Sequence, residues 1–129
     1  MIADTTFLVD VLCGQSEAVR RLKDFQAANT HFSIPTPSIV ELWGGLAHAK
    51  SSSEREELLN ILASQIIYDL DKESAIQAGE IYLYLIRQGR QIDLMDIMIA
   101  GIALRHNEVI LTRNSQHCGR IPGIAIETY

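Results

Sequence analysis

The sequence contains few of the residues that mark several classes of protein. Its 129 residues include only two cysteines and three prolines. Cys13 and Cys118 are far apart and belong to no Cys-x-x-Cys or Cys/His pattern, so the sequence offers neither a disulfide framework nor zinc-site spacing. We therefore expect two reduced thiols in a cytoplasmic protein.

A long apolar run and an excess of basic residues are absent too. No stretch of about 18 apolar residues exists, so no membrane span is predicted. Asp4 and Asp10 interrupt the N-terminal apolar segment, which is not typical of a secretion signal. The 11 Lys and Arg residues against 16 Asp and Glu residues give a formal charge of −5. This balance excludes a broad basic nucleic-acid coat, although it is compatible with a local basic rim.

Apolar residues make up 47% of the chain, which is typical of a folded protein. A chain of this length buries roughly two-thirds of its unfolded surface, so we expect one domain over residues 1–129. Short apolar segments alternate with segments of helical periodicity, which predicts an α/β fold whose mainly parallel sheet of four or five strands is flanked by helices. The strands are expected at residues 1–4, 32–34, 66–68, 109–112 and 124–126.

Helix boundaries are indicated by capping residues. Ser16 is expected to cap one helix, and Thr36 and Pro37 are expected to supply the cap and first position of another. Gly14 and Gly89 are expected to end helices.

Four polar side chains fall at predicted strand ends and helix starts, where sites form in such a sheet. They are Asp4, Glu41, Asp96 and Asn114. Carboxylate and amide oxygens are hard ligands, suited to Mg²⁺ or Mn²⁺. Clustered carboxylates repel one another without a cation, and such a cation can activate water and stabilise charge on a phosphate oxygen.

Three of these side chains also have purely structural interpretations. Asp4 could cap the first helix, and Asp96 could be the third residue of a helix begun by Asp93. Asn114 could be an ordinary turn residue. Spacing alone leaves both interpretations open.

Glu41 is less readily explained by local structure. Ser38-x-x-Glu41 resembles a capping box. However, the start at Thr36 and Pro37 places Glu41 too deep in the helix to complete one. Lying beside Leu42, Glu41 needs a partner if it is partly buried.

Four segments of the chain resemble, in order, the motifs of PIN-domain proteins. The first is MIADTTFLVD at residues 1–10, and the second is IPTPSIVELWGG at 34–45. The third is DLMDIMIAG at 93–101, and the last is LTRN at 111–114 followed by RIPGI at 120–124. The short chain is similar to the VapC branch, the ribonuclease toxins of toxin–antitoxin pairs.

The resemblance assigns roles to the acidic residues. It implies that Asp4 and Asp96 are the principal metal ligands and that Glu41 is a third acid, which helps to bind the metal or orients water. Asn114 completes the catalytic set at a position where many members of the family have a fourth aspartate.

The resemblance also bears on the neighbours of these acids. Thr6 and Thr112 would supply oxygens that support the ligands without binding the metal. Arg113 and Arg120 are candidate RNA-binding residues, because arginine contacts to phosphate give affinity that is largely independent of sequence. Cys118 stands where an aromatic residue is common in the family.

The function implied is that of a VapC-like toxin, a metal-dependent endoribonuclease. It would cleave RNA with water activated by carboxylate-bound Mg²⁺ or Mn²⁺, and a cognate VapB-like antitoxin would inhibit it. Toxins of this branch usually form homodimers. The leucines expected to supply an apolar patch for that contact are Leu46, Leu58, Leu59 and Leu62.

The competing interpretation is a binding module whose acidic site docks a partner without cleavage. A receiver-like domain would need a phosphorylatable aspartate after a middle strand and a late lysine, whereas the late strand here ends in Thr112, Arg113 and Asn114. A dinucleotide-binding domain is disfavoured because no Gly-x-Gly-x-x-Gly motif follows a strand.

Overall fold

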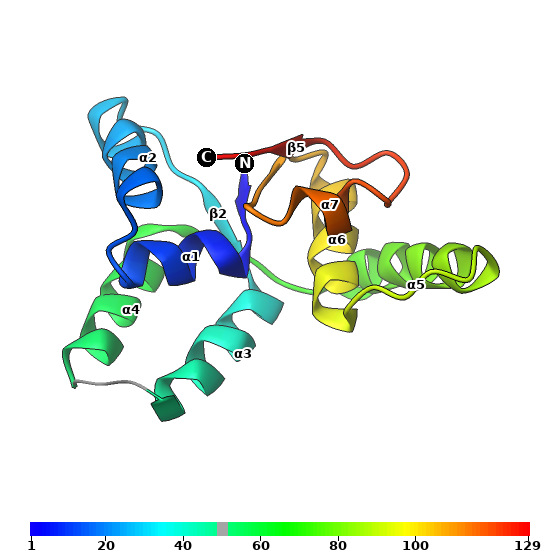
Figure 1. The fold of residues 1–129 in the computed structure, drawn as a ribbon, viewed down its shortest axis with the longest axis horizontal. Helices are drawn as coiled ribbons and strands as arrows, with labels where there is room; N and C mark the ends of the chain where they lie inside the picture. Colours follow the sequence, from blue (N-terminus) through cyan, green and yellow to red (C-terminus); the bar gives the residue numbers. More distant parts are fainter. Residues whose placement is uncertain (49–51) are drawn as a thin grey trace.

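Over residues 1–48 and 52–129, which the structure describes, the computed structural model shows five short strands alternating with helices (Figure 1). The strands are β1 (Ile2–Ala3), β2 (Ser33–Pro35), β3 (Ile66–Tyr68), β4 (Ile110–Leu111) and β5 (Ile126–Glu127). The helices are α1 (Thr5–Leu12), α2 (Ser16–Ala27), α3 (Thr36–Gly45), α4 (Ser53–Ser64), α5 (Lys72–Arg87), α6 (Leu94–His106) and α7 (Ser115–Cys118), with a 3₁₀ turn η1 (Leu46–His48) after α3.

The strands form one sheet in the order β3-β2-β1-β4-β5, and each neighbouring pair is parallel. The predicted α/β fold with a parallel sheet is therefore confirmed. From β1 the chain builds outward through β2 to β3, and then returns to place β4 on the other side of β1. The order of the sheet reverses between β1 and β4, and ligand sites of such sheets form beyond the carboxyl ends of the strands at this point.

The sheet separates two hydrophobic clusters, because successive side chains of a strand point to opposite faces. Ile2 and Ile110 face α5 and α6, whereas Ala3 and Leu111 face α1. The α5–α6 cluster comprises Ile2, Ala78, Ile81, Leu85, Ile97, Ile99, Ala100, Ile102, Ala103, Ile110 and Ile121. The α1–α4 cluster comprises Ala3, Phe7, Leu8, Val11, Ala18, Phe32, Ile34, Leu42, Leu58 and Leu111. Figure 1 accordingly shows α5 and α6 on one side and α1, α2 and α4 on the other.

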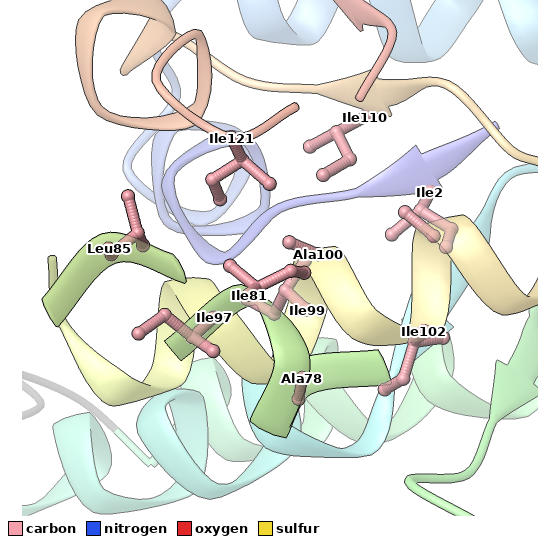
Figure 2. Packing of buried hydrophobic residues seen from close by; sticks show 11 residues of the cluster. Ile2, Ala78, Ile81, Leu85, Ile97, Ile99, Ala100, Ile102, Ile110 and Ile121 are labelled. Atoms are coloured by element: carbon pink, nitrogen blue, oxygen red, sulfur yellow. The ribbon is translucent and has the colours of Figure 1, made fainter. Parts of the chain in front are cut away.

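The helix α6 is buried along most of its length, as its continuous apolar sequence predicts. Figure 2 shows Ile97, Ile99 and Ile102 of α6 among Ala78 and other residues of the α5–α6 cluster. The close approach of α5 depends on Gly101. A Cβ atom at Gly101 would lie 2.6 Å from the carbonyl oxygen of Ser74 and 2.8 Å from the Cβ of Ala78.

Two predicted helix caps are wrong. Gln15, not Ser16, caps α2, because its side-chain oxygen accepts a hydrogen bond from the backbone N–H of Ala18 at 2.8 Å. Pro35 occupies the cap position of α3 without a side-chain bond. The Thr36 hydroxyl instead accepts the N–H of Leu70 at 3.0 Å, so long-range contact overrides its local capping preference.

The last strand is also displaced from its predicted position, since β5 pairs Ile126 and Glu127 with β4 rather than residues 124–126. The backbone N–H groups of Ile110 and Thr112 donate to the carbonyl oxygens of Ala125 and Glu127, which gives this register. The short helix α7, between β4 and β5, was not anticipated from the sequence.

The predicted apolar patch of Leu46, Leu58, Leu59 and Leu62 spans η1 and α4 and is only partly exposed, since Leu46 and Leu62 are partly buried. Leu58 is fully buried in the α1–α4 cluster, and only Leu59 is largely exposed. The largest group of exposed apolar side chains on one described element lies on α5 instead, at Ile76, Tyr82, Leu83, Tyr84 and Ile86. In the part of the chain that is described, no helix is long and apolar enough to cross a membrane.

We predict that Gly101→Ala destabilises the protein because α5 must move away from α6. The expected loss is about 1–3 kcal/mol, or roughly 5–10 °C in the thermal midpoint. Gly79→Ala is the matched control, because Gly79 lies in α5 with no atom within 4 Å of its added Cβ. That variant should gain up to about 1 kcal/mol from helix propensity. Circular dichroism melts that rank Gly101→Ala at or above wild type would contradict this packing.

Candidate active site at the carboxyl ends of β1 and β4

The four predicted site residues come from elements near the carboxyl ends of β1 and β4, the switch point at which the strand order reverses. Asp4 follows β1 directly and is nearly buried, with 4% of its surface exposed. Asn114 lies just after β4 and is half-buried, as is Asp96 in the first turn of α6. Glu41 lies on α3 and is exposed, so its partial burial among apolar residues is not observed.

The Asp4 carboxylate is held by three hydrogen bonds. Its Oδ1 accepts the N–H of Thr5 at 2.7 Å, and this bond makes Asp4 the cap of α1. Its Oδ2 accepts the hydroxyls of Thr6 at 2.9 Å and Thr112 at 2.7 Å. Thr112 is itself oriented, because its oxygen accepts the N–H of Asn114 at 2.9 Å. Asp4 is therefore both a helix cap and a fixed carboxylate at the switch point.

Glu41 is joined to this arrangement through Thr5. The Thr5 hydroxyl donates to Oε2 of Glu41, and it lies 3.0 Å from the hydroxyl of Ser38. Thr5 thus contacts Asp4 with its backbone N–H and Glu41 with its side chain. The sequence interpretation gave neither Thr5 nor Ser38 a role in the site. Thr5 follows Asp4 directly, and Ser38 lies one helical turn before Glu41.

Asp96 is placed by the start of α6. Asp93 caps that helix, since its Oδ1 accepts the N–H of Met95 at 2.8 Å, and Asp96 is the third helical residue. Asp4 and Asp96 are both close enough to Cys118 for their charges to act on its thiol. Burial is the main cause that raises the pKa of the Cys118 thiol to about 12, and the charges of Asp4 and Asp96 contribute to the rise. Both carboxylates therefore act on one small region.

The donor chemistry of this region fits a hard divalent cation better than a soft one. Asp4 and Asp96 offer carboxylate oxygens, and the high pKa of Cys118 keeps its sulfur a neutral thiol. Within residues 1–48 and 52–129, no three His, Cys, Asp or Glu side chains are grouped closely enough to hold an ion. Mg²⁺ does not need such a cage, because it keeps several waters and binds through one or two carboxylates.

A second buried carboxylate lies beside the predicted site. Asp10 is 6% exposed, and its Oδ2 accepts the hydroxyl of Tyr129 at 2.7 Å and pairs with Nη1 of Arg113 at 3.1 Å. The sequence interpretation used Asp10 only as a break in an apolar run. The sequence does contain a signal for Asp10: it lies four residues after Thr6 in the predicted helix, which puts both side chains on the same helical face.

The two candidate RNA-binding arginines are exposed near the site. Arg113 follows Thr112 directly, and its guanidinium side chain is 61% exposed despite the contact with Asp10. Arg120 lies after α7 and is also exposed.

We predict that the two cysteines differ strongly in reactivity. At pH 8, a thiol with a pKa of about 12 carries on the order of one thiolate in ten thousand, so Cys118 should resist a disulfide reagent while exposed Cys13 reacts. Because the folded thiol has the higher pKa, its contribution to stability is fully present below the ordinary thiol pKa of 9.0 and is lost as the pH rises from there toward 12. Thiol counting should find one fast group in the native protein and two in denaturant. Two equally fast groups would contradict the buried position of Cys118.

Comparison with known proteins places this arrangement in a family. A PIN-domain family model matches residues 1–120. The tRNA(fMet)-specific endonuclease VapC of Salmonella typhimurium is 28% identical over 127 residues, which span 98% of this chain and 95% of that protein.

Solved structures agree with the sequence comparison. VapBC from Salmonella typhimurium, in a DNA-bound structure, has a TM-score of 0.81 and 27% identity, covering 98% of this chain and 96% of that one. VapBC2 from Rickettsia felis, bound to a promoter DNA fragment, has a TM-score of 0.85 over 99% of this chain and 97% of that one; at 24% identity it supports the fold alone. With a family model that covers residues 1–120 and relatives matched over nearly their full length, the chain belongs to the PIN-domain family.

Proposed function

We propose that this protein is a VapC-type endoribonuclease, a toxin that hydrolyses phosphodiester bonds of RNA. The observation that carries the proposal is the buried Asp4 carboxylate at the end of β1, fixed by Thr6 and Thr112, together with Asp96, whose charge acts with that of Asp4 on Cys118. The full-length similarity to an endonuclease named VapC supports the choice of RNA as substrate.

Nucleases of the PIN-domain family are typically metal-dependent, and we propose Mg²⁺ or Mn²⁺ for this one. Asp4 and Asp96 would hold the ion, with Glu41 as the third acid. A bound divalent cation activates water and offsets negative charge on a phosphate oxygen. Two of the three hydrogen bonds to Asp4 use Oδ2 and one uses Oδ1, so Oδ1 retains more capacity for a ligand bond.

The remaining polar residues would act on water and substrate. Glu41 is exposed and its Oε2 is held by Thr5, so its carboxylate would accept a proton from an attacking water. Asn114 adds an uncharged polar side chain beside Thr112 and would orient water or phosphate. Thr6 and Thr112 would keep the Asp4 carboxylate in one rotamer, which avoids reorganisation during the reaction.

The proposed partners are inferred from the VapBC structures to which this chain is similar. We propose that a VapB-like antitoxin inhibits the enzyme. We also propose a homodimer, for which the exposed apolar side chains of α5, including Ile76 and Ile86, offer surface.

The central prediction is that Asp4→Asn and Asp96→Asn abolish metal-dependent RNA cleavage. Each variant removes one carboxylate of the proposed pair, so we expect a loss of at least about a hundredfold in the cleavage rate. The wild type should lose activity in EDTA and recover it with Mn²⁺. Cleavage of a labelled RNA by identically purified proteins measures the rates, and calorimetry measures Mn²⁺ affinity.

Asp93→Asn is the matched control, because it removes one charge three residues from Asp96 while asparagine keeps the cap of α6. It should retain both activity and Mn²⁺ binding. If Asp4→Asn cleaves the same bonds at the wild-type rate, the nuclease assignment fails and a non-cleaving binding module takes its place. Equal Mn²⁺ affinity in wild type and Asp96→Asn would end the ligand assignment alone.

The homodimer has its own test. Light scattering should report a mass near twice that of the 14.4 kDa chain at micromolar concentration. Ile76→Glu combined with Ile86→Glu should shift this mass toward the monomer if α5 supplies the contact, because burying two charges is costly. A wild type that is monomeric throughout the micromolar range would count against the dimer.

A further inference from the structure

The contact of Asp10 with Tyr129 and Arg113 has no role in the proposed metal site. We call these three residues the arginine clamp. Tyr129 and Arg113 both bind the same oxygen, Oδ2 of Asp10, at 2.7 and 3.1 Å. The Asp10 side chain is 9% exposed and the Arg113 side chain is 61% exposed, so the clamp joins a buried anion to a cation that faces solvent.

Tyr129 is the rigid member of the clamp. Its ring packs edge-to-face on Phe7, with centroids 5.1 Å apart. Burial and the hydrogen bond to Asp10 raise the pKa of the Tyr129 hydroxyl, so it remains a proton donor at neutral pH. A buried carboxylate requires such compensation, and Tyr129 thereby fixes the orientation of the oxygen that Arg113 binds.

Arg113 is also tied directly to the predicted active site. Its backbone N–H points to the hydroxyl oxygen of Thr6 at 3.4 Å, and that hydroxyl donates to Asp4. The preceding residue, Thr112, donates to Asp4 as well. The backbone and the guanidinium of Arg113 are therefore both anchored at the edge of the site.

We propose that Asp10 and Tyr129 are positioning residues that hold Arg113 so that the solvent-facing edge of its guanidinium binds an RNA phosphate beside Asp4. This inference rests on the proposed function and assigns a substrate contact within it. A guanidinium carries five N–H donors, so one nitrogen can bind Asp10 while others bind phosphate. Lysine offers a single ammonium group and cannot reproduce this planar division.

Charge explains why such positioning matters in this chain. The protein carries a formal charge of −5, and the proposed metal ligands add local repulsion toward RNA. A freely rotating arginine loses conformational entropy when it binds phosphate, which weakens binding. An arginine already held in place loses less, so the clamp should increase RNA affinity severalfold.

The test is a double-mutant cycle on RNA affinity. Fluorescence anisotropy with a labelled single-stranded RNA, in EDTA to prevent cleavage, compares wild type, Tyr129→Phe, Arg113→Ala and the double variant. Tyr129→Phe should raise Kd about three- to tenfold when Arg113 is present and leave it unchanged when Arg113 is absent. Arg113→Lys should bind nearly as weakly as Arg113→Ala.

Arg120→Ala is the matched control for loss of one positive charge near the site. Tyr129→Phe should weaken binding in the Arg120→Ala background by the same factor as in wild type. With Mn²⁺ present, Tyr129→Phe should raise KM by a similar factor and change kcat little. A purely structural clamp predicts instead a lower thermal midpoint and the same change in RNA affinity with or without Arg113.

The remaining outcomes are also decisive. Tyr129→Phe keeps the ring on Phe7, and Asp10→Asn serves as the second variant if the first fails to fold. Equal effects of Tyr129→Phe in both Arg113 backgrounds, or no effect in either, would overturn the positioning role. A wild type that does not bind RNA would overturn it too. A wild type that binds but does not cleave would instead reject the nuclease proposal and leave the coupling measurement valid.

Discussion

The hydrogen bond from the Thr112 hydroxyl to the Asp4 carboxylate joins the ends of β1 and β4, and the candidate site depends on it. These strands are each two residues long, so their pairing alone does little to fix the residues just beyond their carboxyl ends. Thr112 extends the ordered backbone beyond the end of β4, because its hydroxyl oxygen also accepts the N–H of Asn114. Thr6 adds a donor from α1 to the same carboxylate oxygen. The hydrogen bonds of one carboxylate therefore align the ends of β1 and β4, cap α1 and fix the orientation of Asp4.

The polar contacts of this region keep its carboxylates available for a cation. Neutral hydroxyls and a backbone N–H compensate the buried charge of Asp4. The guanidinium of Arg113, at the same edge of the sheet, pairs with Asp10 instead. A lysine or arginine bound directly to Asp4 would neutralise it and compete with a metal ion. The chain therefore separates the carboxylate that we propose binds metal from the carboxylate that holds an arginine.

The sequence was sufficient for the parallel sheet and for locating Asp4 and Asp96, because both depend on local patterns. A strand followed by an aspartate, and a buried helix capped by Asp93, can be recognised from consecutive residues. The cap at Gln15 could not be predicted, because it depends on the conformation of a long side chain. The displaced β5 could not be predicted, because its position depends on pairing with a distant strand. The arginine clamp could not be predicted for the same reason: it joins residues more than one hundred positions apart.

The two hydrophobic clusters meet at the candidate site. Asp4 adjoins Ala3 of the α1–α4 cluster, and Asp96 adjoins Ile97 of the α5–α6 cluster. The two acids thus adjoin different clusters, which are joined through β1 and β4 and through direct contact between α3 and α6. The spacing of the acids is set by how the two clusters pack on opposite faces of the sheet. Substitutions deep in either core that change its packing should therefore alter the distance between the acids without touching the site.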